Sequence, residues 1–471
     1  MMELFWRAVI VFNGLVILYF LVLNGFYLAT SFLAYGALRR YALRLKTMDL
    51  ERFLRSGAAP PITLVSPAFN EEATLEEAVR SLLSLNYPDY EVLVCNDGST
   101  DGTLHTLTEA FNLEPVDRVP MGDIPTARVR GTYRSRRYPN LWVLDKENGG
   151  KADALNAGIN YCRSALFCAM VADSLLERDS LLRVVRPFLE DSRTVAAGGI
   201  IRIANGCVIR KGHVEEVGLP KSFLARLQVL EYLRAFLSGR MGWDALDSTL
   251  IVSGAFGIFD RSLVVQVGGY STETVGEDME LVVRLHRHCR EEEIPYRITF
   301  VPDPVAWTEA PETLPVLARQ RDRWQRGLLE SLMKHRIMLL NPRYGRLGLV
   351  AYPYFFFLEM IGPLVEGLGY LSFLLTLLAG RASPLYVVAF LAVAFVLGIV
   401  LSISAVCLEE LTFRRYPRRR DLILLFFIGV LENLGYRQLN TYWRFRGTLS
   451  GLFGKRGWGV MTRKGFGSGE E

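Results

Sequence analysis

The longest uncharged run of this chain constrains its fold more than any other feature. Residues 8–38 contain no Asp, Glu, Lys or Arg, and about 20 apolar residues suffice for a helix to cross a bilayer. A cleaved signal peptide would have a shorter apolar core, followed by a small-residue cleavage site. We therefore expect residues 1–45 to form a retained N-terminal transmembrane anchor.

The C-terminal third predicts further membrane segments. It holds three long apolar stretches, at residues 347–380, 385–408 and 421–436. Two prolines and two glutamates interrupt the first stretch, which favours an interfacial helix followed by a span. The last stretch is barely long enough to cross a membrane unless it continues through Glu432 and Asn433. We assign residues 347–445 to a C-terminal transmembrane region and residues 446–471 to a basic tail.

Basic residues beside the apolar stretches predict the orientation. Arg and Lys follow the first span, precede the second and follow the third, and such residues stay on the cytoplasmic side. We therefore expect a multi-pass protein of the inner (plasma) membrane whose middle region is cytoplasmic. The basic tail conflicts with a simple crossing by residues 421–436. Either that segment is re-entrant or interfacial, or residues 347–380 contain an extra crossing.

Charge and cysteine content narrow the function classes. The net charge is only +5, and the basic residues cluster beside the membrane segments and in RVRGTYRSRR, residues 128–137, which we interpret as a loop. This distribution favours membrane lipids or anionic phosphates over nucleic acid, for which the sequence holds no recognition motif. The six cysteines lie far apart with no CxxC pair, which argues against disulfides and a zinc site.

The middle region, residues 60–310, alternates strand and helix patterns. Short apolar runs predict strands at residues 62–69, 91–97, 141–146 and 165–173. Apolar periodicity and helix caps predict helices at residues 71–85 and 100–111. Such alternation predicts an α/β fold with a mixed, mainly parallel sheet and helices on both faces. Ligands of such sheets bind beyond the carboxyl ends of the strands.

Polar residues gather at the predicted strand ends. They are Asn70-Glu71-Glu72, the run from Asn96 to Asp101, the run from Asn148 to Lys151, and Asp173-Ser174. Each alone is ordinary turn or cap chemistry. Together they form a rim of carboxylates, amides and a lysine, which suits a nucleotide diphosphate held through a divalent cation. NGGKAD lacks the GxxxxGK[ST] spacing, and no GxGxxG follows a strand, so phosphate-loop and dinucleotide sites are excluded.

Six motifs in a fixed order make the interpretation more specific. Between the membrane segments, from about residue 60 to 330, the chain reads PAFNEE, NDGSTDGT, NGGKADALN, VADS, GEDMELVVRLHRH and QRDRWQRG. In this order it resembles the family 2 inverting glycosyltransferases. More closely, it resembles their processive membrane branch, which includes hyaluronan, chitin, cellulose and poly-N-acetylglucosamine synthases. The resemblance implies a GT-A fold, a UDP-sugar donor and a bound Mg²⁺ or Mn²⁺ ion.

The resemblance also implies which residues bind the donor. It implies that Ala68, Glu71 and Asp97 line the uridine pocket and that Lys151 lies near the diphosphate or ribose. Asp173 takes the position of the second acid of the family's DxD motif and would ligate the metal ion. Val171 replaces the first acid, so metal affinity should be weaker or another group must compensate. The alternative is that Asp173 only caps a helix over SLLERDSLLRVV.

For the transfer step, the resemblance assigns the general base to Asp278 of GEDME, with Glu277 beside it. This carboxylate would take the proton of the acceptor hydroxyl while that oxygen attacks the anomeric carbon opposite the departing UDP. The alternative is that both acids only start a helix, where the dipole favours them.

The motif QRDRW contributes Gln320, Arg323 and Trp324. A guanidinium can stabilise the charge on departing phosphate, and an indole can stack on the acceptor sugar. A solvated interfacial helix is the alternative. The glycines of Ser253–Arg261 suit close approach of the backbone to the acceptor. His286 and His288 do not share a helix face, and we expect them at the surface or near phosphate rather than on a metal.

The leading hypothesis is a processive synthase that extends a β-linked exopolysaccharide and moves it through its own spans. A glycan or a lipid-linked sugar would be its acceptor. Two alternatives stay open: a non-processive transferase acting on a lipid acceptor, and a catalytically silent nucleotide-sugar binder, which Val171 motivates. In either active form the catalytic domain is residues 46–310, and residues 311–346 are interfacial helices that carry QRDRW.

Overall fold

The computed structural model describes residues 1–45, 59–171, 174–210, 212–416 and 418–454. The contacts among these residues divide the chain into two compact units. The sheet unit contains Tyr41–Lys221 and Leu246–Ala310, and the helical unit contains Met1–Arg40, Ser222–Ala245 and the described chain from Pro311 onward. Residues 222–245 thus group with the helices, although the sequence-based domain of residues 46–310 includes them.

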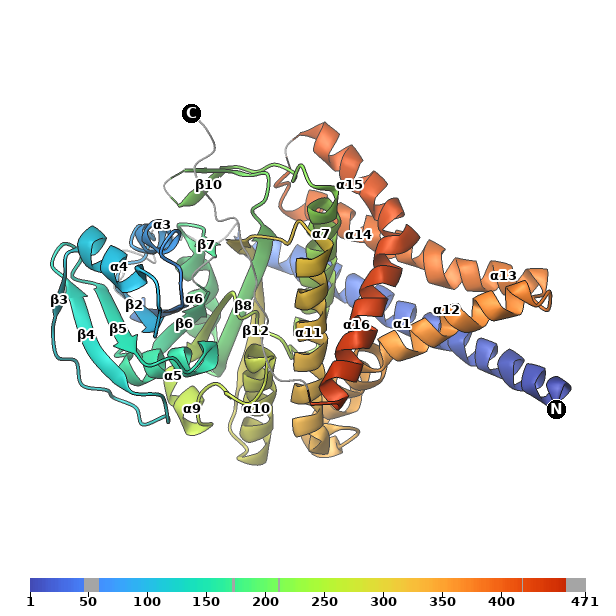
Figure 1. The fold of residues 1–471 in the computed structure, drawn as a ribbon, viewed down its shortest axis with the longest axis horizontal. Coiled ribbons are helices and arrows are strands. Elements are labelled where there is room, and N and C mark those ends of the chain that lie inside the picture. Colours follow the sequence, from blue (N-terminus) through green and yellow to red (C-terminus); the bar gives the residue numbers. More distant parts are fainter. Residues whose placement is uncertain (46–58, 172–173, 211, 417, 455–471) are drawn as a thin grey trace. The chain divides into compact units, whose positions relative to one another are not determined.

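The sheet unit is built on one ten-stranded sheet with the order β3-β4-β5-β2-β1-β6-β11-β8-β12-β7, as counted over the described residues (Figure 1). Its strands are β1 (Ile62–Ala68), β2 (Tyr90–Asp97), β3 (Leu113–Pro115), β4 (Val129–Ser135), β5 (Leu141–Lys146), β6 (Leu166–Met170), β7 (Leu175–Leu176), β8 (Thr194–Ile203), β11 (Phe256–Asp260) and β12 (Arg297–Thr308). A separate hairpin joins β9 (Val208–Arg210) to β10 (His213–Glu216).

The directions of the strands confirm the predicted mixed sheet. β1 is parallel to β2 and to β6, and β2 is parallel to β5. β11 is antiparallel to both β6 and β8, so β8 runs in the same direction as β6, and β12 is parallel to β8. The carboxyl ends of β1, β2, β5 and β6 therefore meet at one edge of the sheet.

Helices cover both faces of the sheet. Gly198 and Gly199 are neighbours on β8, and successive residues of a strand point to opposite faces. A β-carbon at Gly198 would meet Val252, whereas one at Gly199 would meet Val184 of α6 (Ser180–Glu190). The other helices of the unit are α3 (Leu75–Leu82), α4 (Thr103–Phe111), α5 (Lys151–Tyr161), α9 (Arg261–Gln266) and α10 (Glu277–Glu291).

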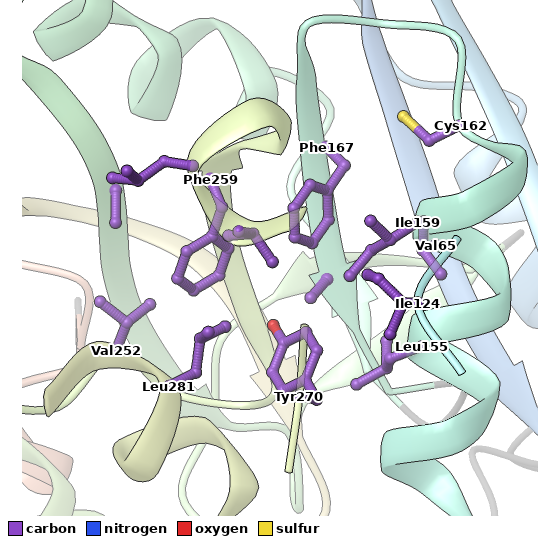
Figure 2. Close-up of a cluster of buried hydrophobic side chains, with 14 of the residues drawn as sticks. Val65, Ile124, Leu155, Ile159, Cys162, Phe167, Val252, Phe259, Tyr270 and Leu281 are labelled. Carbon is purple, nitrogen blue, oxygen red and sulfur yellow. The ribbon is translucent and has the colours of Figure 1, made fainter. Parts of the chain in front are cut away.

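The core on the Val252 face joins the helices to the strands that carry the site. Figure 2 shows Phe167 of β6 and Phe259 of β11 side by side, with Tyr270 and Leu281 close to them. The two phenylalanine rings are stacked with their centroids 5.6 Å apart. Buried side chains of α5, α9 and α10 belong to the same cluster. This packing fixes α5 and α10, whose first residues include Lys151 and Asp278, against one sheet.

Two local predictions for this unit are wrong. RVRGTYRSRR is not a loop, because its residues 129–135 form β4, paired with β3 and β5. No helix begins at Ser174, because Leu175–Leu176 form β7 against β12 and α6 starts only at Ser180. The alternative role of Asp173 as the cap of such a helix concerns a residue outside the described ones.

The helical unit contains the long apolar helices expected from the sequence. Over the described residues, three helices are long and apolar enough to cross a membrane: Met2–Leu43, Pro384–Thr412 and Arg419–Leu452. A fourth candidate is a bent pair, Leu347–Met360 and Gly362–Leu378, with an angle of 43° at the break. The predicted interruption of residues 347–380 is thus a bend. The helix before the bend is π-helical over Leu347–Ala351 and Tyr354–Met360.

The last candidate span is also broken, at a polar position. α15 (Arg419–Leu431) and α16 (Arg437–Leu452) are separated by non-helical backbone at Leu434 and Gly435. Glu432, just before the break, is fully buried and accepts hydrogen bonds from Arg234 and Ser402. Buried charge at this position is paired within the helical unit, as ionisable groups in membrane segments usually are.

Within the helical unit, α16 packs closely on α11 (Leu314–Lys334), the helix that carries QRDRW. A β-carbon at Gly447 would come within 2.8 Å of the Asp322 carbonyl oxygen, and one at Gly451 within 2.6 Å of Leu329. Two glycines four residues apart let helix backbones approach closely. The unit also contains α1 (Met2–Leu45) as far as Arg40, and α7 (Phe223–Leu233), α8 (Met241–Asp244), α12 (Gly362–Leu378), α13 (Pro384–Leu391) and α14 (Leu397–Thr412). Short 3-10 and π-helical segments are η1 (Arg234–Arg240), η2 (Arg336–Met338), η3 (Pro342–Tyr344), η6 (Ala392–Val396) and η7 (Glu432–Tyr436).

Candidate functional site

The loops after β1 and β2 are joined by hydrogen bonds. Asn70 adopts a left-handed conformation (φ 55°), and its side-chain oxygen accepts a hydrogen bond from the Thr100 amide at 2.8 Å. The Glu71 amide donates to the Thr103 hydroxyl at 3.0 Å, and the Glu71 carboxylate accepts from Thr74. These bonds hold Glu71 beside the carboxyl end of β2, while Ala68 is buried at the end of β1.

Asp97 ends β2 and organises the next loop. Its carboxylate, almost completely buried, accepts hydrogen bonds from the amides of Gly149 at 3.0 Å and Gly150 at 2.8 Å. Its carbonyl oxygen accepts one from the Asn148 side chain at 2.7 Å. Asp97 therefore fixes the loop that leads into α5 and Lys151. The charge-assisted bonds to backbone amides are of the stronger kind.

Lys146 is a buried cation that the sequence analysis did not single out. Its ammonium group lies 2.5 Å from Asp97 and 2.6 Å from Asp153 of α5, and its side chain has no solvent exposure. Burial alone would lower the pKa of this lysine, but the hydrogen bonds to Asp153 and Asp97 outweigh that effect and raise the pKa. The parallel register of β2 with β5 sets Lys146 opposite Asp97, and the structure, not the sequence, supplies that register.

Three of the predicted residues meet at the start of α10. Lys151 Nζ lies 2.7 Å from the carboxylate of Glu277, which is buried. Asp278 is only partly buried, and its Oδ2 accepts a hydrogen bond from the amide of Gly254 at 2.8 Å. A β-carbon at Gly254 would come within 2.9 Å of Lys151 Nζ and 3.0 Å of Asp278 Oδ2, so a larger residue there would displace one or both of these groups.

The two neighbouring acids therefore differ in environment. Glu277 is paired with Lys151 and enclosed, whereas the partly exposed Asp278 carboxylate accepts hydrogen bonds from the amides of Gly254 and Met279. Each oxygen of a carboxylate has two lone-pair positions, so Asp278 can still accept a proton from a ligand. This arrangement places an accessible base, Asp278, beside the internal ion pair of Lys151 with Glu277.

The predicted metal position falls outside the described residues. Asp173 is not described, β6 ends at Met170, and the half-buried Val171 follows it. Within the described ranges, no group of three or more His, Cys, Asp or Glu side chains could hold a metal ion. The described side chains alone thus do not assemble a metal site, and the role of Asp173 stays a prediction.

His286 is not at the surface, so that prediction is wrong. It is 1% exposed, and its ring nitrogens lie 2.9 Å from the Thr249 carbonyl oxygen and 2.9 Å from the Tyr296 hydroxyl. Burial lowers the pKa of His286 to about 4. The helix expected after the two acids is present as α10, but the sequence of one chain does not reveal which of its polar residues turns inward. His288, by contrast, is half-buried.

The QRDRW residues lie on α11 in the helical unit. Gln320 is buried, Arg323 is partly exposed, and the Trp324 side chain is 43% exposed. The guanidinium of Arg321, which pairs with Glu231 at 2.6 Å, lies 4.2 Å from the centroid of the Trp324 ring. An exposed indole held against a buried cation suits stacking on a sugar. Its participation in one site with Asp278 stays a prediction.

Comparison with known proteins identifies the family. The family model "Glycosyl transferase family 2" matches residues 63–262, and "Glycosyl transferase family group 2" matches residues 168–401. The chain is 27% identical over 274 residues to the poly-beta-1,6-N-acetyl-D-glucosamine synthase of Staphylococcus aureus (strain COL), and 26% identical to that of Staphylococcus epidermidis. Each match covers 58% of this chain and 56% of the relative.

Among solved structures, the chain is similar to the mannosyltransferase PcManGT from Pyrobaculum calidifontis in complex with GDP-Man and Mn²⁺. That similarity covers 88% of this chain and 99% of the other, with 19% identity and a TM-score of 0.49. The two family models together extend from residue 63 to residue 401 and include both the sheet edge with Asp97 and Asp278 and the helix with QRDRW. The chain is a family 2 glycosyltransferase with a GT-A fold.

Proposed function

We propose that this enzyme transfers sugar units from a UDP-sugar to a growing β-linked exopolysaccharide with inversion at the anomeric carbon. The observation that carries the proposal is the environment of Asp278, an accessible carboxylate beside the enclosed ion pair of Lys151 with Glu277. The curated relatives are named poly-beta-1,6-N-acetyl-D-glucosamine synthases, which favours UDP-N-acetylglucosamine over UDP-glucose. The chain spans about half the length of those relatives, so the sugar and product belong to the proposal.

In the proposed reaction, Asp278 accepts the proton of the acceptor hydroxyl while that oxygen attacks the anomeric carbon. A bond forms between this oxygen and the anomeric carbon, and the bond from that carbon to the phosphate oxygen of UDP breaks on the opposite face. UDP leaves with the electron pair. Gly254 orients the Asp278 carboxylate through its amide, and Glu277 stays paired with Lys151, so Asp278 is the acid available for the proton.

The donor would be held at the carboxyl ends of β1 and β2. Ala68 and Glu71 would line the uridine pocket, and Asp97 would act both there and by fixing the loop of residues 148–150. Gln320 and Arg323 would meet the departing phosphates, and Trp324 would stack on the acceptor sugar. The exposed Trp324 ring and its support by Arg321 favour this part of the proposal.

The apolar helices and their basic flanks favour an enzyme of the inner (plasma) membrane with its sheet unit in the cytoplasm. UDP-sugars are charged and do not cross lipid unaided, so the donor site must face the compartment that holds them. In this proposal the elongating glycan passes through the same chain. Acceptors would be the glycan itself or a lipid-linked sugar.

The proposal is tested with the purified full-length protein in detergent. UDP release is measured with a panel of UDP-sugars, and the product is then digested with linkage-specific glycosidases. We expect release from UDP-N-acetylglucosamine and a long polymer. A short lipid-linked product would favour the non-processive transferase, and UDP binding without release from any donor would favour the silent binder.

A divalent cation, Mg²⁺ or Mn²⁺, is part of the proposal, with Asp173 as its anchor, and would bind the diphosphate. Val171→Asp restores the DxD spacing, so we expect unchanged transfer or a tighter dependence on metal. Mn²⁺ binding is followed by electron paramagnetic resonance, and UDP release is measured in parallel. Val171→Leu is the control that adds no ligand. Lost Mn²⁺ binding in Val171→Asp alone would contradict the placement of the metal.

A further inference from the structure

An irregular segment, residues 249–254, is hydrogen-bonded at both ends to α10, the helix that carries Asp278. At its start, the Thr249 carbonyl oxygen lies 2.9 Å from His286 Nε2, and at its end the Gly254 amide donates to Asp278 Oδ2 at 2.8 Å. Both attachments belong to α10, where residues 278 and 286 are about 12 Å apart along the helix axis. The segment therefore bridges two points of one rigid element.

The tautomer and the burial of His286 suit its hydrogen bond to the Thr249 carbonyl oxygen. A carbonyl oxygen only accepts, so Nε2 carries the proton and donates to Thr249, while Nδ1 accepts from the Tyr296 hydroxyl at 2.9 Å. Both ring nitrogens are thus satisfied, and the ring is buried. Burial also keeps the imidazole neutral near pH 7. A neutral, fixed ring far from solvent has no part in the transfer chemistry described above.

We propose that His286 is a positioning residue for the base: it holds segment 249–254 so that the Gly254 amide points at Asp278 Oδ2. This proposal rests on the proposed function, since it needs Asp278 to be the proton acceptor. The hydrogen bond from the Gly254 amide fixes the direction of the Asp278 carboxylate. A loosened segment withdraws that bond, so the carboxylate is less well oriented toward the acceptor hydroxyl.

Other groups also influence Asp278 and must be kept constant. Lys151 from α5 and Glu277 from α10 lie next to it. Burial raises the Tyr270 pKa, and the charges of Asp278 and Glu277 raise it further. His286 bonds to Thr249 and Tyr296, and the proposal assigns its effect on Asp278 to segment 249–254.

The test uses the full-length protein and UDP-N-acetylglucosamine as donor, and it compares His286→Phe with His286→Gln. Phenylalanine keeps a ring but removes the donor to Thr249, whereas glutamine keeps an N–H group. We expect kcat to fall about tenfold in His286→Phe and the donor KM to stay within about twofold. His286→Gln should restore most of the lost kcat.

The kcat and KM values together separate a positioning role from a general structural one. An unchanged kcat in an active His286→Phe would overturn the proposal, and so would a loss of kcat that His286→Gln does not restore. Ser81→Ala, which removes a buried hydrogen bond to the Gly212 carbonyl oxygen in the same unit, controls for general destabilisation and should leave kcat unchanged.

A second measurement does not depend on turnover. Hydrogen exchange of the amides in residues 250–254 should become faster in His286→Phe and stay near wild type in His286→Gln. Unchanged protection in His286→Phe would overturn the proposal. If wild-type protein releases UDP from no UDP-sugar, the proposed function fails, and the exchange result still decides whether His286 holds the segment. If His286→Phe does not fold, Tyr296→Phe takes its place and should give the same changes at smaller size.

Discussion

Asp278→Asn is expected to reduce sugar transfer by about 10²- to 10⁴-fold, the usual contribution of a general base. An amide retains the shape of the carboxylate and can still accept the hydrogen bond from the Gly254 amide at its oxygen, but it does not accept the proton of the acceptor hydroxyl. UDP binding should change little, because the predicted uridine residues lie at the ends of β1 and β2. Turnover is measured as UDP release, and binding by calorimetric titration with UDP.

The matched control for Asp278→Asn is Asp117→Asn, at an exposed position between β3 and β4, which should retain full activity. Substantial turnover in Asp278→Asn would remove Asp278 as the base. Loss of UDP binding together with activity would instead mean that the carboxylate supports the donor pocket. The second outcome would also contradict the separation of donor residues from the base on which the proposed mechanism depends.

Lys146→Met should give the largest loss of stability in the sheet unit. Removing the cation leaves the carboxylates of Asp97 and Asp153 buried without their shared partner. Breaking a buried ion pair in this way costs about 3 to 5 kcal/mol. Unfolding is followed by denaturant titration in detergent, and the protection of the Gly149 and Gly150 amides by hydrogen exchange. Both amides should lose protection, since Asp97 holds them.

The pH dependence of this effect follows from the pKa of Lys146. Because that pKa is raised in the folded protein, the contribution of the lysine is complete below the ordinary lysine pKa and is lost only as pH rises through the raised value. The loss in Lys146→Met should therefore be the same at pH 6 and pH 8.

Two further variants control the Lys146 experiment. Arg80→Met removes an exposed cation that pairs with Glu76 and should change stability by less than about 1 kcal/mol. Lys146→Met combined with Asp153→Asn removes one of the two buried charges and should recover part of the loss. A cost in Lys146→Met no larger than that in Arg80→Met would show that the Asp97 loop is held by other contacts.

Local sequence patterns were sufficient to predict the elements whose own residues have a clear apolar periodicity and length. The apolar runs of β1, β2 and β5 and the uncharged run of the first candidate span have the length and periodicity of the elements they form. β4 was missed because its alternate arginines resemble a polar loop. In the folded chain, Arg130 pairs with Asp145 and Arg134 lies over the Trp142 ring, so both are satisfied on a strand.

The sequence by itself determined the elements that carry the strand-end residues, the membrane helices and the family motifs, because these depend on short-range periodicity and on residue order. Only the tertiary structure decided that Lys146 is the buried counter-ion of Asp97 and Asp153, that Glu277 pairs with Lys151 while Asp278 stays accessible, and that His286 turns inward. The physical reason is that pairing and burial depend on residues far apart in the chain, which lie in contact only after the sheet and its helices have packed.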